Sequence, residues 1–292
     1  MEYGLALSGG GIRGAAHVGV LKALGEEGLF PSAIAGASAG GIVAGLFAAG
    51  LEISRMEEAV THLAEKGCEY LDPDYAGMLA FMPQLLAGRS VSLPGLIKGD
   101  KLLSYFLRLT KGIHLDQAAV KLVIPAVDLI SGSTVCFTNA ERVRSWEHVR
   151  WEWDAYLCEA MMASASVPAI FAPRKMSGYL LVDGGVTDNL PVNLLQAAGV
   201  SRVLAVDLGA DYAAPADGSV VETASHAFSI MSSRLKECGS TGELLLLNPP
   251  LSPEAGLLTF DKMKGCMEAG YRYTRDMLPQ IRQAMAGSGI FT

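Results

Sequence analysis

Short apolar runs alternate with helix-like segments along most of this chain, and that alternation restricts the fold more than any other feature. The runs lie at about residues 3–7, 32–37, 122–127, 179–182, 202–206 and 243–247. Runs of this kind, bounded by turn residues, are typical of strands buried on both faces. Between them, apolar residues recur every three or four positions, most clearly from Met267 to Met285. The pattern predicts an α/β fold in one domain, 1–292, with a mostly parallel central sheet and helices on both faces.

Composition excludes several classes of protein. The 292 residues are 50% hydrophobic and carry a formal net charge of −7, which is unlike a disordered or collagen-like chain. An acidic chain without a run of Lys or Arg argues against a nucleic-acid partner. The five Cys are scattered, and the N-terminus lacks the layout of a signal peptide, so we expect reduced thiols and a cytoplasmic location. Composition predicts no oligomeric state.

One uncharged stretch, from Gly28 to Leu51, is long enough in principle to span a bilayer. It contains six Gly and Pro31, however, and its helix-compatible part from about residue 39 to 49 would cover only about 16 Å. We therefore expect a buried strand, a turn and a helix.

A second apolar region lies at about residues 72–112, where Met78, Leu79, Phe81 and Met82 crowd together without a charge. Proline residues divide it into pieces too short to cross a membrane. Two interpretations stay open at this point. The region is either ordinary core or an apolar cap or helical insertion that covers a site or faces lipid.

The first predicted strand is followed by a glycine-rich loop and a helix. Gly9, Gly11 and Gly14 have the G-x-G-x-x-G spacing of a dinucleotide site. Such a site needs an acidic residue about 20 positions later, and the uncharged stretch supplies none; no G-K-[ST] follows either. The loop still offers successive backbone N–H groups at a helix N-terminus, an arrangement that suits a developing oxyanion.

The second predicted strand ends in Gly36-Ala37-Ser38-Ala39-Gly40, directly before a helix. G-x-S-x-G between a strand and a helix is the layout of a nucleophile elbow, which lifts a serine hydroxyl out of the sheet. Taken alone, Ser38 could equally be a turn residue. Both loops leave the carboxyl edge of the sheet, where ligands bind in α/β proteins, so we expect them to lie together.

A serine needs a base to become a nucleophile. A Ser-His-Asp triad would require a late histidine, and His226 is the candidate. A carboxylate in a dry site could serve instead, because burial raises its pKa toward the working pH. Three aspartates follow apolar runs and are candidates by position: Asp128, Asp183 and Asp207. Position alone does not choose among them.

Taken together, these motifs resemble those of the patatin-like phospholipases. The loop Ser8-Gly-Gly-Gly-Ile-Arg-Gly is similar to that family's oxyanion motif, Gly36-Ala-Ser-Ala-Gly to its elbow, and Asp183-Gly-Gly to its aspartate motif. Two further segments, Val127-Asp-Leu-Ile-Ser-Gly and Ala163-Ser-Ala-Ser-Val-Pro, also resemble sequences of that family. The likeness covers about residues 3–210.

The resemblance implies a patatin-like, three-layer α/β/α fold and a Ser–Asp dyad without a catalytic histidine. It implies Ser38 as the nucleophile and Asp183 as the base. Gly9, Gly10 and Gly11 would form the oxyanion hole, and Arg13 would support the loop or bind a lipid phosphate. The expected substrates are acyl esters of phospholipids or lysophospholipids, with no cofactor and no metal, and with peripheral membrane contact as an additional expectation.

Two alternatives from other functional classes stay open. One is a lipid-binding or regulatory module that keeps the fold with little turnover. The other is a soluble carboxylesterase that uses a Ser-His-Asp triad.

Overall fold

The computed structural model describes residues 2–75, 95–209, 220–237 and 242–287. In these residues one sheet of nine strands has the order β5-β4-β3-β2-β1-β8-β9, with β7 also paired to β3 and β6 paired to β7. The strands are β1 (Gly4–Leu7), β2 (Ala33–Gly36), β3 (Lys121–Asp128), β4 (Thr134–Thr138), β5 (Val149–Glu152), β6 (Arg174–Met176), β7 (Tyr179–Asp183), β8 (Val203–Val206) and β9 (Leu245–Leu247).

Eight α-helices accompany the sheet in the described residues. They are α1 (Ala15–Glu26), α2 (Ala39–Ala48), α3 (Ile53–Lys66), α5 (Asp100–Leu109), α6 (Leu157–Ser164), α7 (Val192–Ala197), α8 (Val220–Glu237) and α9 (Met263–Ala286). Five short 3-10 turns complete the order: η1 (Gly11–Gly14), η2 (Gly67–Tyr70), η3 (Leu115–Gln117), η4 (Gly184–Val186) and η5 (Phe260–Lys262).

The centre of the sheet is parallel, as the alternating pattern predicts. β1 pairs in parallel with β2 and β8, β2 with β3, and β8 with β9. β4 and β7 run antiparallel to β3, and β6 runs antiparallel to β7. The sequence pattern missed β4, β5 and β6. β4 returns from β3 after a short turn, which only an antiparallel pair permits, so no helical segment announces it.

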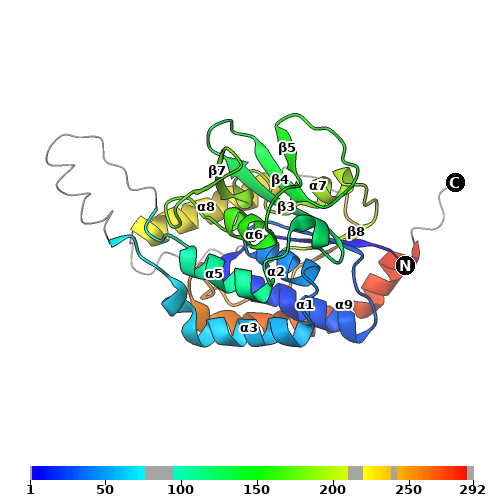
Figure 1. Ribbon diagram of the computed structural model, residues 1–292. Coiled ribbons are helices and arrows are strands. Elements are labelled where there is room, and N and C mark those ends of the chain that lie inside the picture. Colours follow the sequence, from blue (N-terminus) through cyan, green and yellow to red (C-terminus); the bar gives the residue numbers. More distant parts are fainter. Residues whose placement is uncertain (1, 76–94, 210–219, 238–241, 288–292) are drawn as a thin grey trace, which may run out of the picture.

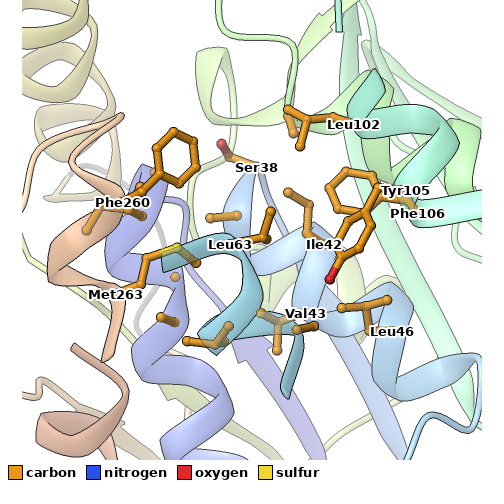
Figure 2. A pocket seen from close by; sticks show the side chains of 18 of the residues that line it. Ser38, Ile42, Val43, Leu46, Leu63, Leu102, Tyr105, Phe106, Phe260 and Met263 are labelled. Atoms are coloured by element: carbon orange, nitrogen blue, oxygen red, sulfur yellow. The ribbon is translucent and has the colours of Figure 1, made fainter. Parts of the chain in front are cut away.

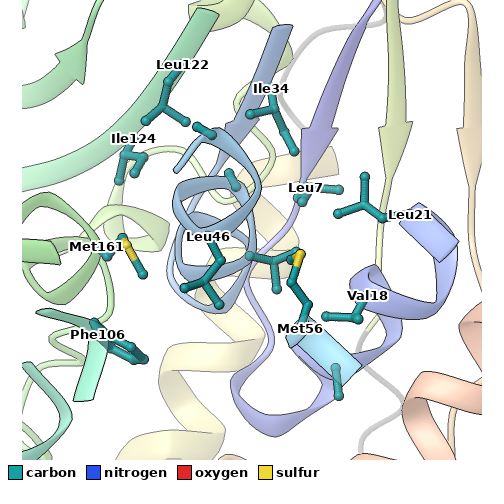
Figure 3. Close-up of a cluster of buried hydrophobic side chains, with 14 of the residues drawn as sticks. Leu7, Val18, Leu21, Ile34, Leu46, Met56, Phe106, Leu122, Ile124 and Met161 are labelled. Atoms are coloured by element: carbon teal, nitrogen blue, oxygen red, sulfur yellow. The ribbon is translucent and has the colours of Figure 1, made fainter. Parts of the chain in front are cut away.

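The two faces of the central strands differ in side-chain size. Leu5, Leu7 and Ile34 belong to the large core cluster, together with side chains of α1, α2, α6 and α9. Ala6 and Ala35 belong to a smaller cluster that α7 covers. Figure 1 shows α1, α3 and α9 on one side of the sheet and α7 on the other, and Figure 3 shows the larger cluster. The expected three layers are therefore present, but the apolar core on one face of the sheet is larger than the core on the other face.

The uncharged stretch forms β2 and α2, as expected. Among the described residues, no helix is both long enough and apolar enough to cross a bilayer. Much of the second apolar region, 76–94, lies outside the described residues, so the predicted cap stays a prediction there. Its described helix, α5, buries Tyr105 and Phe106 and leaves Leu107 exposed.

Helix α9 follows the stretch that resembles the patatin-like family, yet it packs closely along α1. A Cβ on Gly270 would lie 2.2 Å from the Ala16 carbonyl oxygen. Arg275 and Arg282 both pair with Glu27 at the end of α1, at 2.9 and 2.6 Å. The side chains of Cys266 and Ile281 are buried in the large cluster. The C-terminal helix therefore completes the core on which the first helix rests.

We expect Gly270→Ala to lower the free energy of unfolding by roughly 1–3 kcal/mol, because the added methyl group would collide with the α1 backbone. Gly265→Ala is the matched control on the same helix, since its Cβ would meet nothing within 4 Å. The control should be neutral or stabilising by up to about 1 kcal/mol. Urea denaturation of both variants measures this, and equal effects would contradict the close α1–α9 approach.

Candidate active site

Ser38 lies between the end of β2 and the first residue of α2. Its backbone angles, φ 53° and ψ −123°, are strained for a residue with a side chain. The turn is tight enough that a Cβ on Gly36 would lie 2.2 Å from the Gly40 carbonyl carbon, and one on Gly40 would lie 2.4 Å from the Leu7 carbonyl oxygen. The two glycines of G-x-S-x-G are therefore required by close backbone approach. This local geometry is that of a nucleophile elbow.

Two buried serines, one at the end of α6 and one just after it, link Ser38 to Asp183. The Ser38 backbone N–H donates to Ser164 Oγ at 3.0 Å. The Asp183 N–H donates to the Ser166 carbonyl oxygen at 2.9 Å. Both serines are fully buried. They belong to the segment Ala163-Ser-Ala-Ser-Val-Pro, which is part of the family resemblance but for which the sequence predicted no specific role. The structure shows that this segment holds the two candidate catalytic residues in register.

Asp183 is fully buried beside Ser38. Burial raises the pKa of its carboxyl to about 7, although hydrogen bonding from the Ser38 side chain and from the Gly185 N–H opposes the rise. Oδ1 accepts the Gly185 N–H at 2.7 Å. Oδ2 receives no hydrogen bond of standard geometry from the described residues, although the Ser38 hydroxyl lies close enough to the carboxyl to lower its pKa. A carboxyl near neutrality beside a serine can accept its proton.

The other two aspartates that follow apolar runs have different surroundings. Asp128 caps the turn from β3 to β4, where it accepts hydrogen bonds from Ser131 Oγ at 2.7 Å and from the N–H groups of Leu180 and Ser131, both at 2.9 Å. Burial alone would raise the pKa of Asp128, but these hydrogen bonds lower it below its usual value. Asp207 accepts the N–H of Gly209, two residues along its own turn. Of the three, Asp183 is the one that contacts Ser38.

The glycine loop lies against the elbow, since a Cβ on Gly9 would lie 3.1 Å from Ser38 Cβ. The Gly9 N–H, however, already donates to Asn189, to its carbonyl oxygen and to its side-chain Oδ1, both at 3.1 Å. Within the described residues, the N–H groups of Gly10 and Gly11 donate no hydrogen bond. Asn189 lies six residues after Asp183, and no sequence motif marks it as part of the site. Asn189 therefore anchors the start of the loop, and the next two amides remain available to a ligand.

A buried histidine holds the same loop from its other side. His17 on α1 bonds through Nε2 to the Ser8 carbonyl oxygen at 2.8 Å, so Nε2 carries the proton. Burial lowers the pKa of His17 to about 4, which keeps the ring neutral. Ser8 Oγ accepts the Leu208 N–H at 3.0 Å. These contacts give His17 and Ser8 a role in positioning the loop.

Arg13 follows the loop on η1. Its Nε donates to the Ala255 carbonyl oxygen at 2.6 Å and its guanidinium also donates to the Gly209 carbonyl oxygen at 3.1 Å. Of the two roles expected for Arg13, these contacts favour support of the loop. Phosphate binding by Arg13 stays a prediction.

An apolar cavity of about 140 Å³ extends from Ser38 between α2, α3, α5 and η5. Ser38 and Tyr105 carry the only polar side-chain atoms among the described lining residues, and no charged side chain is present there. Figure 2 shows the Ser38 hydroxyl at one end of this space, with Ile42, Val43 and Leu46 of α2 leading away from it. A hydrocarbon chain attached to a reacting carbonyl group would suit such a cavity.

Comparison with known proteins gives a family match and several relatives. Residues 5–195 match the profile of a family described as patatin-like phospholipase. An uncharacterised NTE family protein of Mycobacterium tuberculosis is 31% identical over 217 residues, 73% of this chain and 50% of that protein. Lysophospholipase NTE1 of Mycosarcoma maydis is 27% identical over 209 residues, 72% of this chain and 10% of that protein. The chain thus spans half the length of its mycobacterial relative.

A solved structure shares the fold. VipD from Legionella pneumophila superposes with a TM-score of 0.51 at 15% sequence identity, covering 95% of this chain and 67% of that chain.

The raised pKa of Asp183 predicts a pH-dependent stability. Between pH 4 and 7 the folded carboxyl keeps a proton that the unfolded chain, with a pKa of 3.8, has lost. The contribution of Asp183 to stability should therefore fall as pH rises through this window, by on the order of 4 kcal/mol, and level off above it. The side chain at position 183 in the Asp183→Asn variant does not titrate. The melting temperature of the variant minus that of the wild type should therefore increase from pH 4 to pH 7. A constant difference between the two proteins would contradict a buried, neutral Asp183.

Proposed function

This chain belongs to the patatin-like phospholipase family, and from that membership and the geometry of its site we propose that it is a serine hydrolase of lipid acyl esters. The observation that carries the proposal is the buried carboxyl of Asp183, with a pKa of about 7, in contact with a strained serine at the end of an uncharged cavity. The names of its relatives, lysophospholipase among them, support phospholipids or lysophospholipids as the substrate class.

The proposed reaction has two steps. Asp183 accepts the Ser38 hydroxyl proton as Oγ bonds to the ester carbonyl carbon, and the same proton leaves on the alcohol when the acyl–oxygen bond breaks. Water then loses a proton to Asp183 and attacks the acyl carbon, the bond from that carbon to Ser38 Oγ breaks, Asp183 returns the proton to Oγ, and the fatty acid leaves. The single carboxyl acts as base and then as acid in each step, which its pKa near neutrality permits.

Charge that develops on the carbonyl oxygen would be stabilised by backbone amides. The N–H groups of Gly10 and Gly11 are the proposed donors, and the N-terminus of α2 adds a favourable field beside Ser38. Gly9, whose N–H is bound to Asn189, serves in this proposal to fix the loop. Fixed donors of this kind need no reorganisation during the reaction, and each typically contributes a factor of about 100 to 1,000.

We expect Ser38→Ala and Asp183→Asn each to lower hydrolysis of a chromogenic acyl ester by at least about 1,000-fold in folded protein, because each removes one member of the dyad. The wild-type rate should rise with pH and reach half its plateau near pH 7, since only the ionised Asp183 accepts the proton. Stopped assays across pH 5–9, with circular dichroism to confirm folding, measure both. Full activity in either variant would remove that residue from the mechanism.

His226→Ala separates the dyad from the rival triad. His226 lies on α8, whose Ser232 hydroxyl donates to the Gly185 carbonyl oxygen at 2.8 Å. The dyad predicts that His226→Ala keeps most of the activity, whereas a triad predicts a loss as large as that of Ser38→Ala. Labelling of Ser38 by a fluorophosphonate tests the remaining alternative, a module without turnover, because only an activated serine reacts quickly.

Asn189 should act on catalysis through the loop that it holds. We expect Asn189→Ala to lower kcat by about 10- to 100-fold with little change in KM, because a displaced loop weakens the oxyanion donors and leaves the apolar cavity intact. Asn193→Ala is the matched control: Asn193 lies nearby on α7, and its side chain is not a partner of Gly9. Equal kinetics in the two variants would show that the Gly9–Asn189 contact is not needed.

A further inference from the structure

The cavity follows one stripe of α2 that begins next to Ser38. Ala39, Ile42, Val43 and Leu46 recur at steps of three and four, and all four line the cavity. Figure 2 shows Ser38 and Leu102 at one end and Val43 and Leu46 at the other. The axis of α2 therefore measures the depth of the cavity, starting from the nucleophile.

The end beside Ser38 and the far end differ in exposure. Leu102 and Phe260, which line the cavity near Ser38, are half-buried. At the far end, Leu46 is 5% exposed, Met56 0% and Val18 1%. Figure 3 shows these three side chains, from α2, α3 and α1, within the main apolar core. The cavity thus ends against the packed core of the protein.

The length of α2 from Ser38 to Leu46 gives the length of chain that such a cavity accepts. Leu46 lies eight positions after Ser38, which is about 12 Å at 1.5 Å per residue. An extended hydrocarbon advances about 1.3 Å per carbon, given bonds of about 1.5 Å at tetrahedral angles, so this depth holds about nine or ten carbons.

We propose that the site selects acyl groups of about 8–12 carbons, that one such chain fills the cavity, and that Leu46 and Met56 set the limit. The proposal deepens the proposed function and rests on it in one respect, that the acyl group enters the cavity from Ser38. Leu46 closes the α2 stripe, and Met56 reaches the same end from α3. A longer chain would have to displace close-packed core side chains or leave part of its length outside.

The first test is hydrolysis of p-nitrophenyl esters with chains of 4 to 16 carbons. Each methylene that the cavity buries should raise kcat/KM by up to about fourfold, so the value should climb to a maximum near ten carbons. Beyond about 12 carbons it should level off or fall. A steady increase up to 16 carbons would overturn the proposal.

Substitutions at the closed end should move the maximum in opposite directions. Leu46→Ala deletes three carbon atoms and should extend the preferred chain by about two or three carbons. Leu46→Phe should shorten the preferred chain. Met56→Ala should lengthen the preferred chain, and it serves as the test if the Leu46 variants fold poorly. Leu21→Ala is the matched control, because Leu21 is a fully buried core leucine of α1 that does not line the cavity. The control should keep the wild-type chain-length profile, and a shared shift in all variants would contradict the assignment.

A binding measurement separates this inference from the proposed function. Displacement of a fluorescent fatty acid from Ser38→Ala protein by fatty acids of 6 to 16 carbons needs no turnover. Affinity should rise to about ten carbons and then stop rising, and Leu46→Ala in the same background should extend that limit. If the limit appears in binding but the wild-type protein hydrolyses no ester, the proposed function fails and the cavity limit stands. If affinity grows evenly to 16 carbons, the cavity limit fails.

Discussion

The chemistry proposed for this chain depends on the burial of one carboxyl group. Water is excluded from Asp183, and that exclusion raises its pKa to about 7, where the group can both take and return a proton. The same burial costs stability at neutral pH, because an ionised carboxylate must be kept without water. The surrounding fold therefore has to hold this residue in place, and it does so from both sides. The Asp183 N–H is bound to Ser166 and its Oδ1 is bound to Gly185.

The loop opposite Ser38 is held in a comparable way. Its first amide is bound to Asn189, and the carbonyl before it is bound to His17. Asn189 follows the Asp183-Gly-Gly turn, so one short segment supplies the buried acid and an anchor for the proposed oxyanion loop. Movement of that segment would change both parts of the site together. Positioning groups of this kind account for precision in active sites as much as the reacting groups do.

Much of the fold could be predicted from local patterns. The strands β1, β2, β3, β7, β8 and β9, the helices around them, and the elbow at Ser38 follow from apolar periodicity and glycine spacing. β4 could not, because an antiparallel strand joined to β3 by a short turn leaves no intervening helix to mark it. β5 and β6 have only four and three residues, and apolar periodicity did not mark them. His17 and Asn189 were also beyond reach, since their importance lies in which carbonyl or amide they meet, and no spacing rule encodes that.

The sequence by itself determined the class of fold, the strand-to-helix turn that carries Ser38, and a short set of acids that could act with it. Position after an apolar run left Asp128, Asp183 and Asp207 equivalent, and only the resemblance to a known family favoured Asp183. Tertiary structure distinguishes them. β7 pairs antiparallel with β3 and places Asp183 beside Ser38 in an interior without water, whereas Asp128 accepts the hydrogen bonds of a turn. The physical reason is that a carboxyl's pKa is set by solvent exclusion and nearby donors, and residues distant in the chain supply both.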